Sequence, residues 1–354
     1  MLKEPIVTID ETIVRKNIRK MSAKAKKHDV LLRPHFKTHQ SAEIGAWFRQ
    51  ENISTCAVSS YKMAQYFADN GWQDIMIAFP VIPGLVNEYS DLARNVTLHL
   101  FLSDPEAFDM FKNISHPVQI MIELDTGNKR SGINIQDANL IASLVQKIQH
   151  ESIHHFAGFA VHAGETYHAE SIEQIKSIYT YNQKIFQQLK MQYPEAIISF
   201  GDTPSATNAN DFDGIDELRP GNFVFFDWMQ RQLGSCCADE IAMAVECPVA
   251  ASYEQGERLV VHGGAVHFSK ESVQNEDGKN IFGVVAGTEA GQIEPVGFVE
   301  SLSQEHGIVK IPKEKHRTFS IGDTIPIWPV HSCLVADIAG FYKETNSGRI
   351  IDKM

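Results

Sequence analysis

The sequence alternates between two hydrophobic patterns over most of its first two thirds. Short apolar runs between polar residues predict buried strands, and apolar residues spaced three or four apart predict amphipathic helices. Ile172, Ile175 and Tyr179, for example, share one face of a helix expected over 169–191. Other helices are expected over 41–50, 60–70 and 135–149. The eight predicted strands are residues 30–33, 53–58, 74–79, 96–101, 118–124, 156–161, 197–200 and 215–218.

Strands that alternate with helices indicate an α/β fold with a parallel sheet. Eight such units in one stretch favour a closed (β/α)8 barrel of the TIM type over an open sheet. We therefore predict a barrel over residues 15–230.

The pattern changes after Trp228, where helical spacing gives way to short runs separated by Gly, Pro and Asp. Such a texture is typical of a β-rich domain. We expect this second domain to span 231–354, and the strand-like opening residues 1–14 can pair with it. Its predicted strands are residues 241–252, 257–261, 281–285, 294–299, 306–311, 324–328 and 333–338.

Composition and charge exclude several classes of protein. Of the 354 residues, 43% are hydrophobic and 21% charged, which is ordinary for a globular chain with a sizeable core. The net charge of −12 disfavours nucleic acid or an anionic membrane surface as a partner. No apolar run approaches the roughly 20 residues that a bilayer requires. Because Glu4 and Asp10 interrupt the region where a secretory signal needs an apolar stretch, we expect a cytoplasmic protein.

The five cysteines do not suggest a disulfide framework. Their number is odd, Cys236 and Cys237 are adjacent, and no CxxC spacing occurs. Disulfides are also rare in the cytoplasm. We therefore expect free thiols.

The loop after the first predicted strand concentrates basic groups around one lysine. It reads RPHFKTH from Arg33 to His39, with Lys37 near its centre. In a barrel of this kind, functional groups follow the carboxyl ends of the strands. Lys37 could therefore form a Schiff base with a carbonyl cofactor or substrate. A solvated basic loop is the alternative.

The loops after the seventh and eighth strands could hold a phosphate. They offer backbone N–H groups and hydroxyls at the place where barrels commonly bind one. Two tight turns are the alternative interpretation. Combined with a lysine after strand one, however, such a cradle would anchor pyridoxal phosphate at both ends. The predicted phosphate contacts are Gly201, Thr203, Ser205, Gly221 and Asn222.

Two further loops carry polar groups that could reach a cofactor. Arg130 lies between glycines after the fifth strand and could bond to a phenolic oxygen. His162 and Tyr167 follow the sixth strand and could pack on a ring or contact a substrate. Each of these residues, considered alone, is more often structural.

A possible metal pair lies near the carboxyl terminus. In an extended segment, His331 and Cys333 would face the same way, and an imidazole with a thiolate suits zinc. Two protein ligands leave positions open for water and substrate, as a Lewis-acid site requires. A buried His and a buried Cys are the alternative. Glu305 could orient a ligand. Lys270 is the runner-up candidate for a Schiff-base lysine, but it lies outside the predicted barrel mouth.

Six ordered motifs together resemble one family. They are RPHFKTH, DTGNKRSG, GDTPS, ELRPGNFVFFD, SLSQEHG and PVHSC, which span Arg33 to Cys333. This combination resembles the fold-type III pyridoxal phosphate family that contains D-threonine aldolase and D-serine dehydratase. The resemblance implies an alanine racemase-like fold, with an N-terminal barrel, a C-terminal β domain, an active site near their junction and a homodimer.

The resemblance also assigns roles to residues. Lys37 matches the Schiff-base lysine and Arg130 the arginine beside the cofactor, while His162 and Tyr167 fall in the active-site segment. GDTPS and RPGN match the phosphate loops, and His331 with Cys333 matches the metal pair. Asp202 stands where family members often have serine. Since a carboxylate repels phosphate, we expect Asp202 to point away or to cap a helix.

The cysteine of the metal pair bears on the reaction. Within the family, HxC resembles zinc-dependent dehydratases, whereas HxD resembles aldolases that use harder divalent ions, in line with the softness of thiolate. We expect a pyridoxal 5'-phosphate- and Zn2+-dependent lyase that acts on D-serine or a related small β-hydroxy-D-amino acid. A D-threonine-type aldolase, an amino-acid racemase and a non-catalytic pyridoxal phosphate-binding protein remain alternatives.

Overall fold

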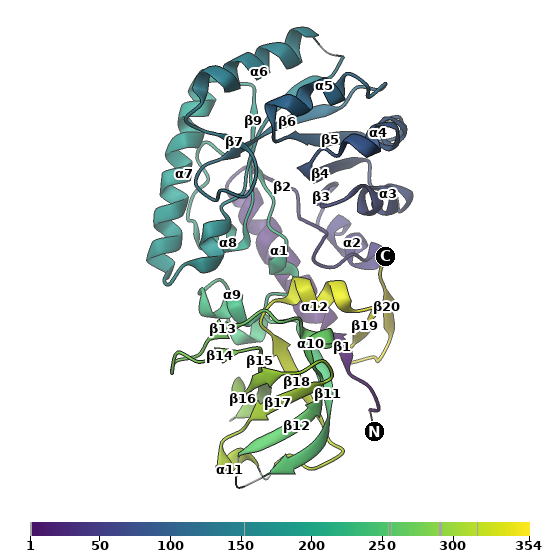
Figure 1. Cartoon of the computed structure of the whole chain (residues 1–354), viewed down its shortest axis with the longest axis vertical. Coiled ribbons are helices and arrows are strands. Elements are labelled where there is room, and N and C mark those ends of the chain that lie inside the picture. Colours follow the sequence, from purple (N-terminus) through teal and green to yellow (C-terminus); the bar gives the residue numbers. More distant parts are fainter. Residues whose placement is uncertain (1, 152, 254, 256, 290–291, 317) are drawn as a thin grey trace. The chain divides into compact units, whose positions relative to one another are not determined.

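The computed structural model describes residues 2–151, 153–253, 255, 257–289, 292–316 and 318–354. The chain forms two compact units, and Figure 1 shows their elements in chain order. The barrel unit comprises Arg19–Lys37, Ile44–Gly221 and Met354, and the β-rich unit comprises Met1–Ile18, Thr38–Glu43 and Asn222–Lys353. The ranges 15–230 and 231–354 stay predictions of the domain boundaries.

Parallel strands form the centre of the barrel unit. Their order is β2-β10-β9-β8-β6-β5-β4-β3, with the short β7 (Ile133–Asn134) added beside β6. The two ends of this order meet at a bridge between His35 and Ala57, where Phe36 N donates to Ala57 O at 2.8 Å. The sheet is thus a nearly closed barrel. Its strands are β2 (Leu31–Leu32), β3 (Thr55–Val58), β4 (Asp74–Pro80), β5 (Thr97–Leu102), β6 (Gln119–Asp125), β8 (His155–Val161), β9 (Ile197–Phe200) and β10 (Glu217–Leu218).

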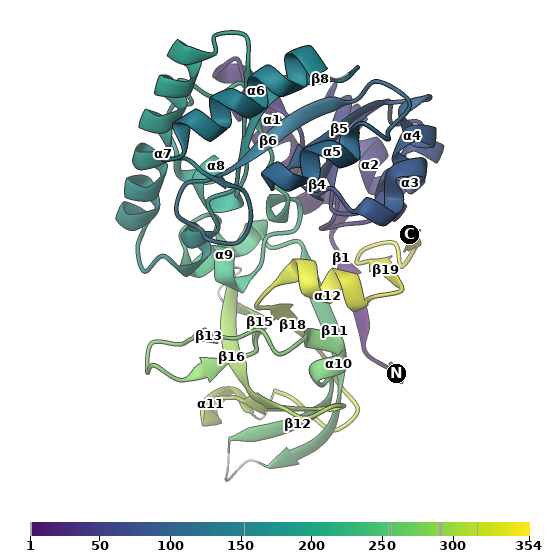
Figure 2. The ribbon, with the colours of Figure 1, turned by 45° about the horizontal axis from the view of Figure 1, so that its top comes forward.

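Helices alternate with these strands, as the apolar spacing predicts (Figure 2). Helix α7 buries Ile175, Tyr179 and Phe186, and its first turn is capped by Ser171, whose hydroxyl accepts from Gln174 N. The helices are α1 (Glu11–Lys27, shared by both units), α2 (Ala42–Arg49), α3 (Tyr61–Asp69), α4 (Val86–Ala93), α5 (Phe108–Phe111), α6 (Ala138–Glu151), α7 (Ile172–Gln192) and α8 (Thr203–Asn208).

An aromatic cluster fixes the segment that carries Lys37. The ring of Phe36 lies 4.8 Å from that of Phe67 and 4.7 Å from that of Trp72, between centroids. Phe36 and Phe67 have no exposed surface, and burying an aromatic side chain stabilises the fold by about 2 kcal/mol. The residue before Lys37 is therefore anchored in the core.

Antiparallel strands form the β-rich unit. The strands pair in the order β12-β17-β16-β15-β18-β11, and β11 also pairs with β12, so they close a ring. A β-bulge between Val249 and Ala251 bends strand β11 where it pairs with β12. The opening strand β1 (Ile6–Ile9) pairs with β11 and extends the sheet toward β19 and β20. These strands are β11 (Met243–Tyr253), β12 (Arg258–His262), β15 (Gly283–Glu289), β16 (Gln292–Leu302), β17 (His306–Lys310), β18 (Thr324–Pro329), β19 (Phe341–Glu344) and β20 (Ile350–Asp352).

One predicted strand is wrong. Residues 333–338 form helix α12 (Ser332–Ile338), not a strand. Its buried residues are Ser332, Val335 and Ala336, a helical spacing that we interpreted as a continuous apolar run. The predicted strand 281–285 is also divided, because Phe282 separates β14 (Asn280–Ile281) from β15. Short elements missed by the pattern include β7, β19, β20, β13 (Val273–Gln274), α9 (Trp228–Gln232), α10 (Ala265–Phe268) and α11 (Lys313–His316).

The predicted architecture, a (β/α)8 barrel followed by a C-terminal β domain, is confirmed. Among the described residues, no helix has the length and apolar character needed to cross a bilayer.

Candidate active site

Lys37 follows β2 on a backbone whose neighbouring residues are buried. Residues 32–36 and 38–41 are buried, whereas the Lys37 side chain is exposed. The backbone N–H of Lys37 donates to His35 Nδ1 over 3.4 Å, and His35 N donates to Pro220 O at 2.9 Å. A fixed backbone at the carboxyl end of a barrel strand thus presents an accessible amine.

Basic side chains from several strands gather around this point. The pKa of His35 is well below its usual range because the ring is buried and because Lys37, Arg219, His162 and Arg130 are close enough to repel its proton. The structure therefore brings Lys37, Arg130 and His162 together, as the sequence predicts. Such a concentration of cationic groups favours a ligand with several negative charges.

His162 is held as a neutral ring. Burial, then the charges of Arg130 and Lys37, lower its pKa to about 3. Its Nδ1 donates to the carbonyl of Gly201, so the assigned tautomer leaves Nε2 as an acceptor. Tyr167 lies beside it, with the ring centroids 6.2 Å apart. The hydroxyl oxygen of Tyr167 accepts from Thr203 N at 3.3 Å, which links this loop to the 201–205 segment.

The 201–205 segment contains two buried hydroxyl groups, on Thr203 and Ser205. Thr203 Oγ1 and Ser205 Oγ are buried and lack a hydrogen-bond partner among the described residues. An unsatisfied buried hydroxyl costs roughly 1–3 kcal/mol, so two in one turn indicate a missing ligand or water. Gly201 has no room for a side chain, since a Cβ there would lie 2.9 Å from Arg219 Cβ.

Asp202 caps the helix that follows. Its Oδ1 accepts from Ser205 N at 2.6 Å and from the Thr166 hydroxyl at 3.0 Å, which confirms the expected helix cap. Burial raises the pKa of Asp202 to about 7, despite these hydrogen bonds. Asp202 Oδ2 is buried and has no partner within the ranges that the structure describes, so protonation relieves the cost of a buried charge.

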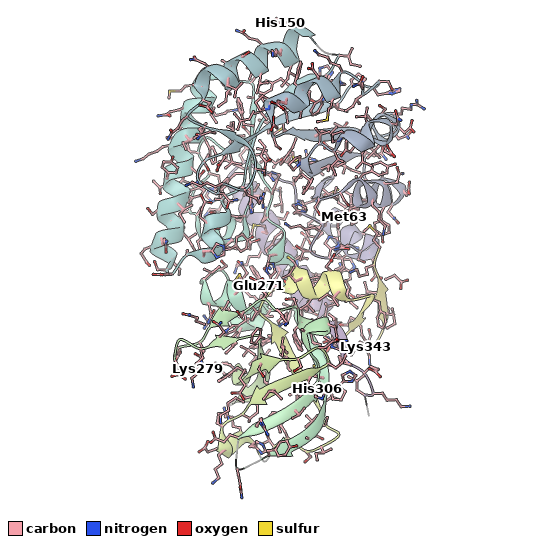
Figure 3. The ribbon with its side chains drawn as sticks, viewed as in Figure 1. Met63, His150, Glu271, Lys279, His306 and Lys343 are labelled. Atoms are coloured by element: carbon pink, nitrogen blue, oxygen red, sulfur yellow. The ribbon has the colours of Figure 1, made fainter. Side chains whose placement is uncertain are left out.

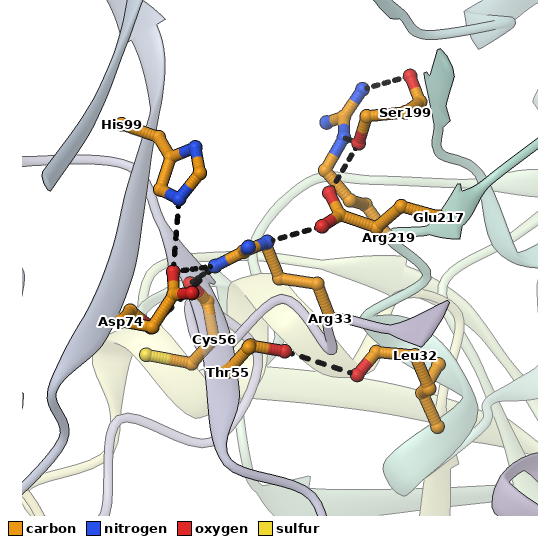
Figure 4. A network of polar contacts seen from close by, with 9 residues as sticks. All are labelled: Leu32, Arg33, Thr55, Cys56, Asp74, His99, Ser199, Glu217 and Arg219. Carbon is orange, nitrogen blue, oxygen red and sulfur yellow. Dashed lines mark hydrogen bonds and ion pairs between the residues drawn. The ribbon is translucent and has the colours of Figure 1, made fainter. Parts of the chain in front are cut away.

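Arg219 is a candidate site residue that the sequence analysis did not single out. Its Nε donates to Ser199 Oγ at 2.6 Å (Figure 4). An Nη donates to Val161 O at 2.8 Å. Burial lowers its pKa to about 10, so the guanidinium stays charged at neutral pH. A signal existed, because Arg219 opens the RPGN loop directly after a predicted strand.

A buried polar network lies beneath this site. Arg33 Nε donates to Glu217 Oε2 at 2.7 Å, and Arg33 Nη1 lies 2.6 Å from Asp74 Oδ1 (Figure 4). Burial would raise the pKa of Asp74, but a hydrogen bond from His99 and the charge of Arg33 hold it at about 2. Ser199 Oγ donates to Glu217 Oε1 at 2.5 Å. The network thereby fixes the Ser199 hydroxyl, which accepts the hydrogen bond from Arg219 Nε.

The RPGN loop divides between the two units. Gly221 ends the barrel unit, and Asn222 begins the β-rich unit. The Asn222 amide donates to Asp227 Oδ2 at 2.5 Å and to Cys333 Sγ at 3.7 Å. These hydrogen bonds place the Asn222 side chain beside Cys333 of the predicted metal pair. A phosphate contact for Gly221 or Asn222 stays a prediction.

The structure brings the predicted metal pair together, although by a different geometry. His331 is the N-cap of α12 and Cys333 lies in its first turn, so the extended segment that we assumed is absent here. Burial favours a neutral His331, but the hydrogen bond and charge of Cys333, with Asp227, raise its pKa to about 9. The two side chains are therefore in contact.

Several hydrogen bonds orient this pair. Thr38 Oγ1 lies 3.2 Å from Cys333 Sγ within the β-rich unit. Asp227 Oδ2 accepts from Ser332 N at 2.9 Å and from Ser332 Oγ at 3.2 Å, which fixes the start of the helix. Outer contacts of this kind orient metal ligands.

Other groups singled out in the sequence lie elsewhere. Lys270 is exposed just after α10 in the β-rich unit. Cys236 and Cys237 are both free thiols, as expected, and burial raises the pKa of Cys236 far above its usual range. The carboxylate of Glu305 lies 3.7 Å from His262 Nε2.

Comparison with known proteins identifies both parts of the chain. Residues 9–228 match the model of the alanine racemase N-terminal domain, and residues 242–343 match a putative serine dehydratase domain.

Three relatives match over much of their length. D-threo-3-hydroxyaspartate dehydratase of Delftia sp. is 26% identical over 94% of this chain and 91% of its own. Its solved structure has a TM-score of 0.91, at 25% identity, and covers 100% of this chain and 98% of that one. D-serine dehydratase of Dictyostelium discoideum is 27% identical over 98% of this chain and 94% of its own. D-threonine aldolase of Arthrobacter sp. is 25% identical over 63% of this chain and 61% of its own.

These relatives agree with the resemblance seen in the six motifs. The alanine racemase model alone matches well over half of the 354 residues. The chain therefore belongs to the family defined by the alanine racemase N-terminal domain, and it carries a putative serine dehydratase domain after it.

Proposed function

We propose that this protein is a pyridoxal phosphate- and zinc-dependent dehydratase of D-serine or a related β-hydroxy-D-amino acid. The products would be a keto acid and ammonia. The observation that carries the proposal is the placement of His331 at the N-cap of α12 and of Cys333 in its first turn, because a thiolate with an imidazole suits zinc. The names of the two dehydratases among the relatives support the same reaction.

The residues of the barrel unit fit pyridoxal phosphate. Thr203 and Ser205 supply buried hydroxyls that lack a hydrogen-bond partner in the described part of the chain, as a phosphate-binding turn requires. Lys37 supplies an accessible amine, and Arg130 and Arg219 add positive charge near it. We assign the lysine attachment to Lys37 and the phosphate contacts to the 201–205 segment.

The residues of the β-rich unit fit a catalytic zinc ion. His331 and Cys333 would provide two ligands, and the remaining positions would be open to water and substrate. Thr38 and Asn222 would keep the sulfur oriented through their hydrogen bonds. A hard oxygen ligand in place of Cys333 would favour manganese or magnesium instead.

Each group would contribute a defined step. When bound, pyridoxal phosphate delocalises negative charge from Cα, and zinc polarises the β-hydroxyl as a Lewis acid. The amine of Lys37, once the substrate's amine has displaced it from the cofactor, would take the proton from Cα. Neutral His162 and Tyr167 would line the site, and Arg130 would balance the negative charge of the ligand. Loss of water then gives an enamine that hydrolyses to the keto acid and ammonia.

A D-threonine-type aldolase is the main alternative, and the Arthrobacter relative carries that name. A racemase and a pyridoxal phosphate-binding protein without turnover are the others. A screen of D-amino acids with product analysis separates all four. Keto acid and ammonia support elimination, glycine with an aldehyde supports cleavage, the L enantiomer supports racemisation, and no turnover by the cofactor-loaded protein contradicts an enzymatic role.

A further inference from the structure

A second set of metal-ligating side chains lies in the β-rich unit, outside the site described above. His262, His267 and Glu305 each place one ligand atom within 4.8 Å of the others. His262 ends β12, His267 belongs to α10, and Glu305 precedes β17, which begins at His306 (labelled in Figure 3). The rings of His262 and His267 are 5.5 Å apart and nearly perpendicular.

Backbone hydrogen bonds hold these segments in place. Gly263 N donates to Glu305 O at 2.9 Å, and Ala265 N donates to Ser303 O at 2.8 Å. Gly264 permits the close approach, because a Cβ there would lie 2.2 Å from Gln304 O. The main chain therefore brings the three side chains together without help from an ion.

The surroundings of His262 match those of a metal-bound histidine. Its Nε2 lies 3.7 Å from Glu305 Oε2, and its Nδ1 lies 3.5 Å from Glu4 Oε2. Both distances are too long for a good hydrogen bond. Two ligand atoms on tetrahedral zinc lie about 3.3 Å apart, given bonds of about 2.0–2.1 Å, so the Nε2–Glu305 distance suits an ion between them.

We propose that His262, His267 and Glu305 bind a divalent transition metal ion of the zinc class. His262 binds through Nε2, and its Nδ1 lies 3.5 Å from the Glu4 carboxylate, the kind of group that accompanies metal-bound histidines at zinc sites. The two imidazoles select zinc, cobalt or nickel over magnesium and calcium. A water molecule completes the coordination.

Binding has a cost at His267. Gly264 N donates to His267 Nδ1 at 3.2 Å. This hydrogen bond is lost when the His267 ring binds an ion. Burial lowers the pKa of His267, which favours its neutral form. We therefore expect binding that is weaker than at a closed structural zinc site, and reversible by dialysis against a chelator.

The test measures zinc and cobalt binding to tag-free, cofactor-loaded protein, first stripped with a chelator. The variants are His267→Gln and Glu305→Gln, each made in the wild-type chain and in Cys333→Ala, so that the His331–Cys333 site is counted separately. His306→Gln is the matched control, because His306 pairs with His262 across β12 and β17 but lies outside the set. Magnesium is the control ion.

We expect Cys333→Ala to retain one equivalent of zinc, and His267→Gln or Glu305→Gln to remove it. Cobalt bound there should show no sulfur-to-cobalt absorption, whereas cobalt at Cys333 should. The proposal is overturned if zinc stoichiometry is the same with and without His267 and Glu305, or if His306→Gln removes the same equivalent. If zinc does not bind at Cys333, the result expected for His267→Gln and Glu305→Gln is unchanged.

Discussion

The hydroxyl of Thr38 lies 3.2 Å from the sulfur of Cys333. Thr38 has no exposed surface, and it follows Lys37 directly in the sequence. The chain therefore connects the proposed cofactor lysine to a residue that contacts the proposed zinc ligand.

This contact predicts a role for Thr38 in metal binding. Thr38→Val should lower zinc affinity by about 10- to 100-fold, because the sulfur loses the group that orients it. Thr38→Ser keeps a hydroxyl and should stay near wild type. Competition with a coloured zinc chelator measures both affinities. Equal affinities for the valine variant and the wild type would show that the contact has no bearing on the metal.

Replacing Cys333 by aspartate should change the preferred metal. Cys333→Asp exchanges a soft donor for a hard one, so zinc binding should weaken and manganese binding should strengthen. Elimination should fall sharply, and any aldolase side activity should persist or rise with manganese. The visible absorbance of the cofactor should survive. Unchanged elimination and zinc content would mean that Cys333 is a packed core cysteine.

Lys37→Ala should abolish the cofactor's attachment to the protein and nearly all turnover. Free pyridoxal phosphate could still occupy the turn with Thr203 and Ser205. Borohydride reduction followed by peptide mapping locates the modified lysine. Lys270→Ala is the control and should behave as the wild type. A reduced adduct at Lys270 in the Lys37 variant would move the assignment there.

The buried carboxyl of Asp202 predicts a pH effect on the cofactor-free protein. Its folded pKa of about 7 exceeds the unfolded value near 3.8, so its contribution to stability is largest below pH 4. That contribution falls by about 1.4 kcal/mol per pH unit as the pH rises to 7, and is flat above.

Asp202→Asn keeps an oxygen for Ser205 N and does not titrate. The difference in unfolding free energy between wild type and Asp202→Asn should therefore shift in favour of the variant from pH 5 to pH 7. Urea unfolding at several pH values measures this difference. A constant difference would show that Asp202 is ionised throughout this range.

The buried pair of Arg33 and Glu217 predicts a large loss of stability. Glu217→Gln leaves the buried guanidinium with less compensating charge, and breaking such a pair costs about 3 kcal/mol. Glu257→Gln breaks an exposed pair with Lys310 and should change the unfolding midpoint little. Equal midpoints for the two variants would contradict the importance of the network.

Periodicity predicted the elements well where burial has a simple pattern. The strand β9 (Ile197–Phe200) has the predicted bounds, because its apolar or small residues lie between Pro194 and Gly201, which are typical turn residues. The segment 332–338 was misassigned because Leu334, Val335 and Ile338 suit a strand as well as a helix. Its helical start depends on Asp227, which is more than 100 residues away and accepts from Ser332 N at 2.9 Å.

The site was predictable only in part, for a similar reason. Lys37, Arg130 and His162 follow strands whose carboxyl ends meet, so the barrel prediction places them together. The position of Arg219 depends on Ser199 and Glu217, which are buried polar residues on neighbouring strands. No local pattern marks such cross-strand partners. The outer contacts of Cys333 from Thr38 and Asn222 likewise come from distant segments.

The most direct test of the proposed function is elimination by zinc-depleted protein. The cofactor-loaded enzyme is dialysed against a chelator, its zinc content is verified, and keto acid and ammonia from D-serine and other β-hydroxy-D-amino acids are measured before and after zinc is restored. The account predicts that elimination disappears with zinc and returns when zinc is added to the wild type but not to Cys333→Ala. Full elimination by verified zinc-free protein would contradict it.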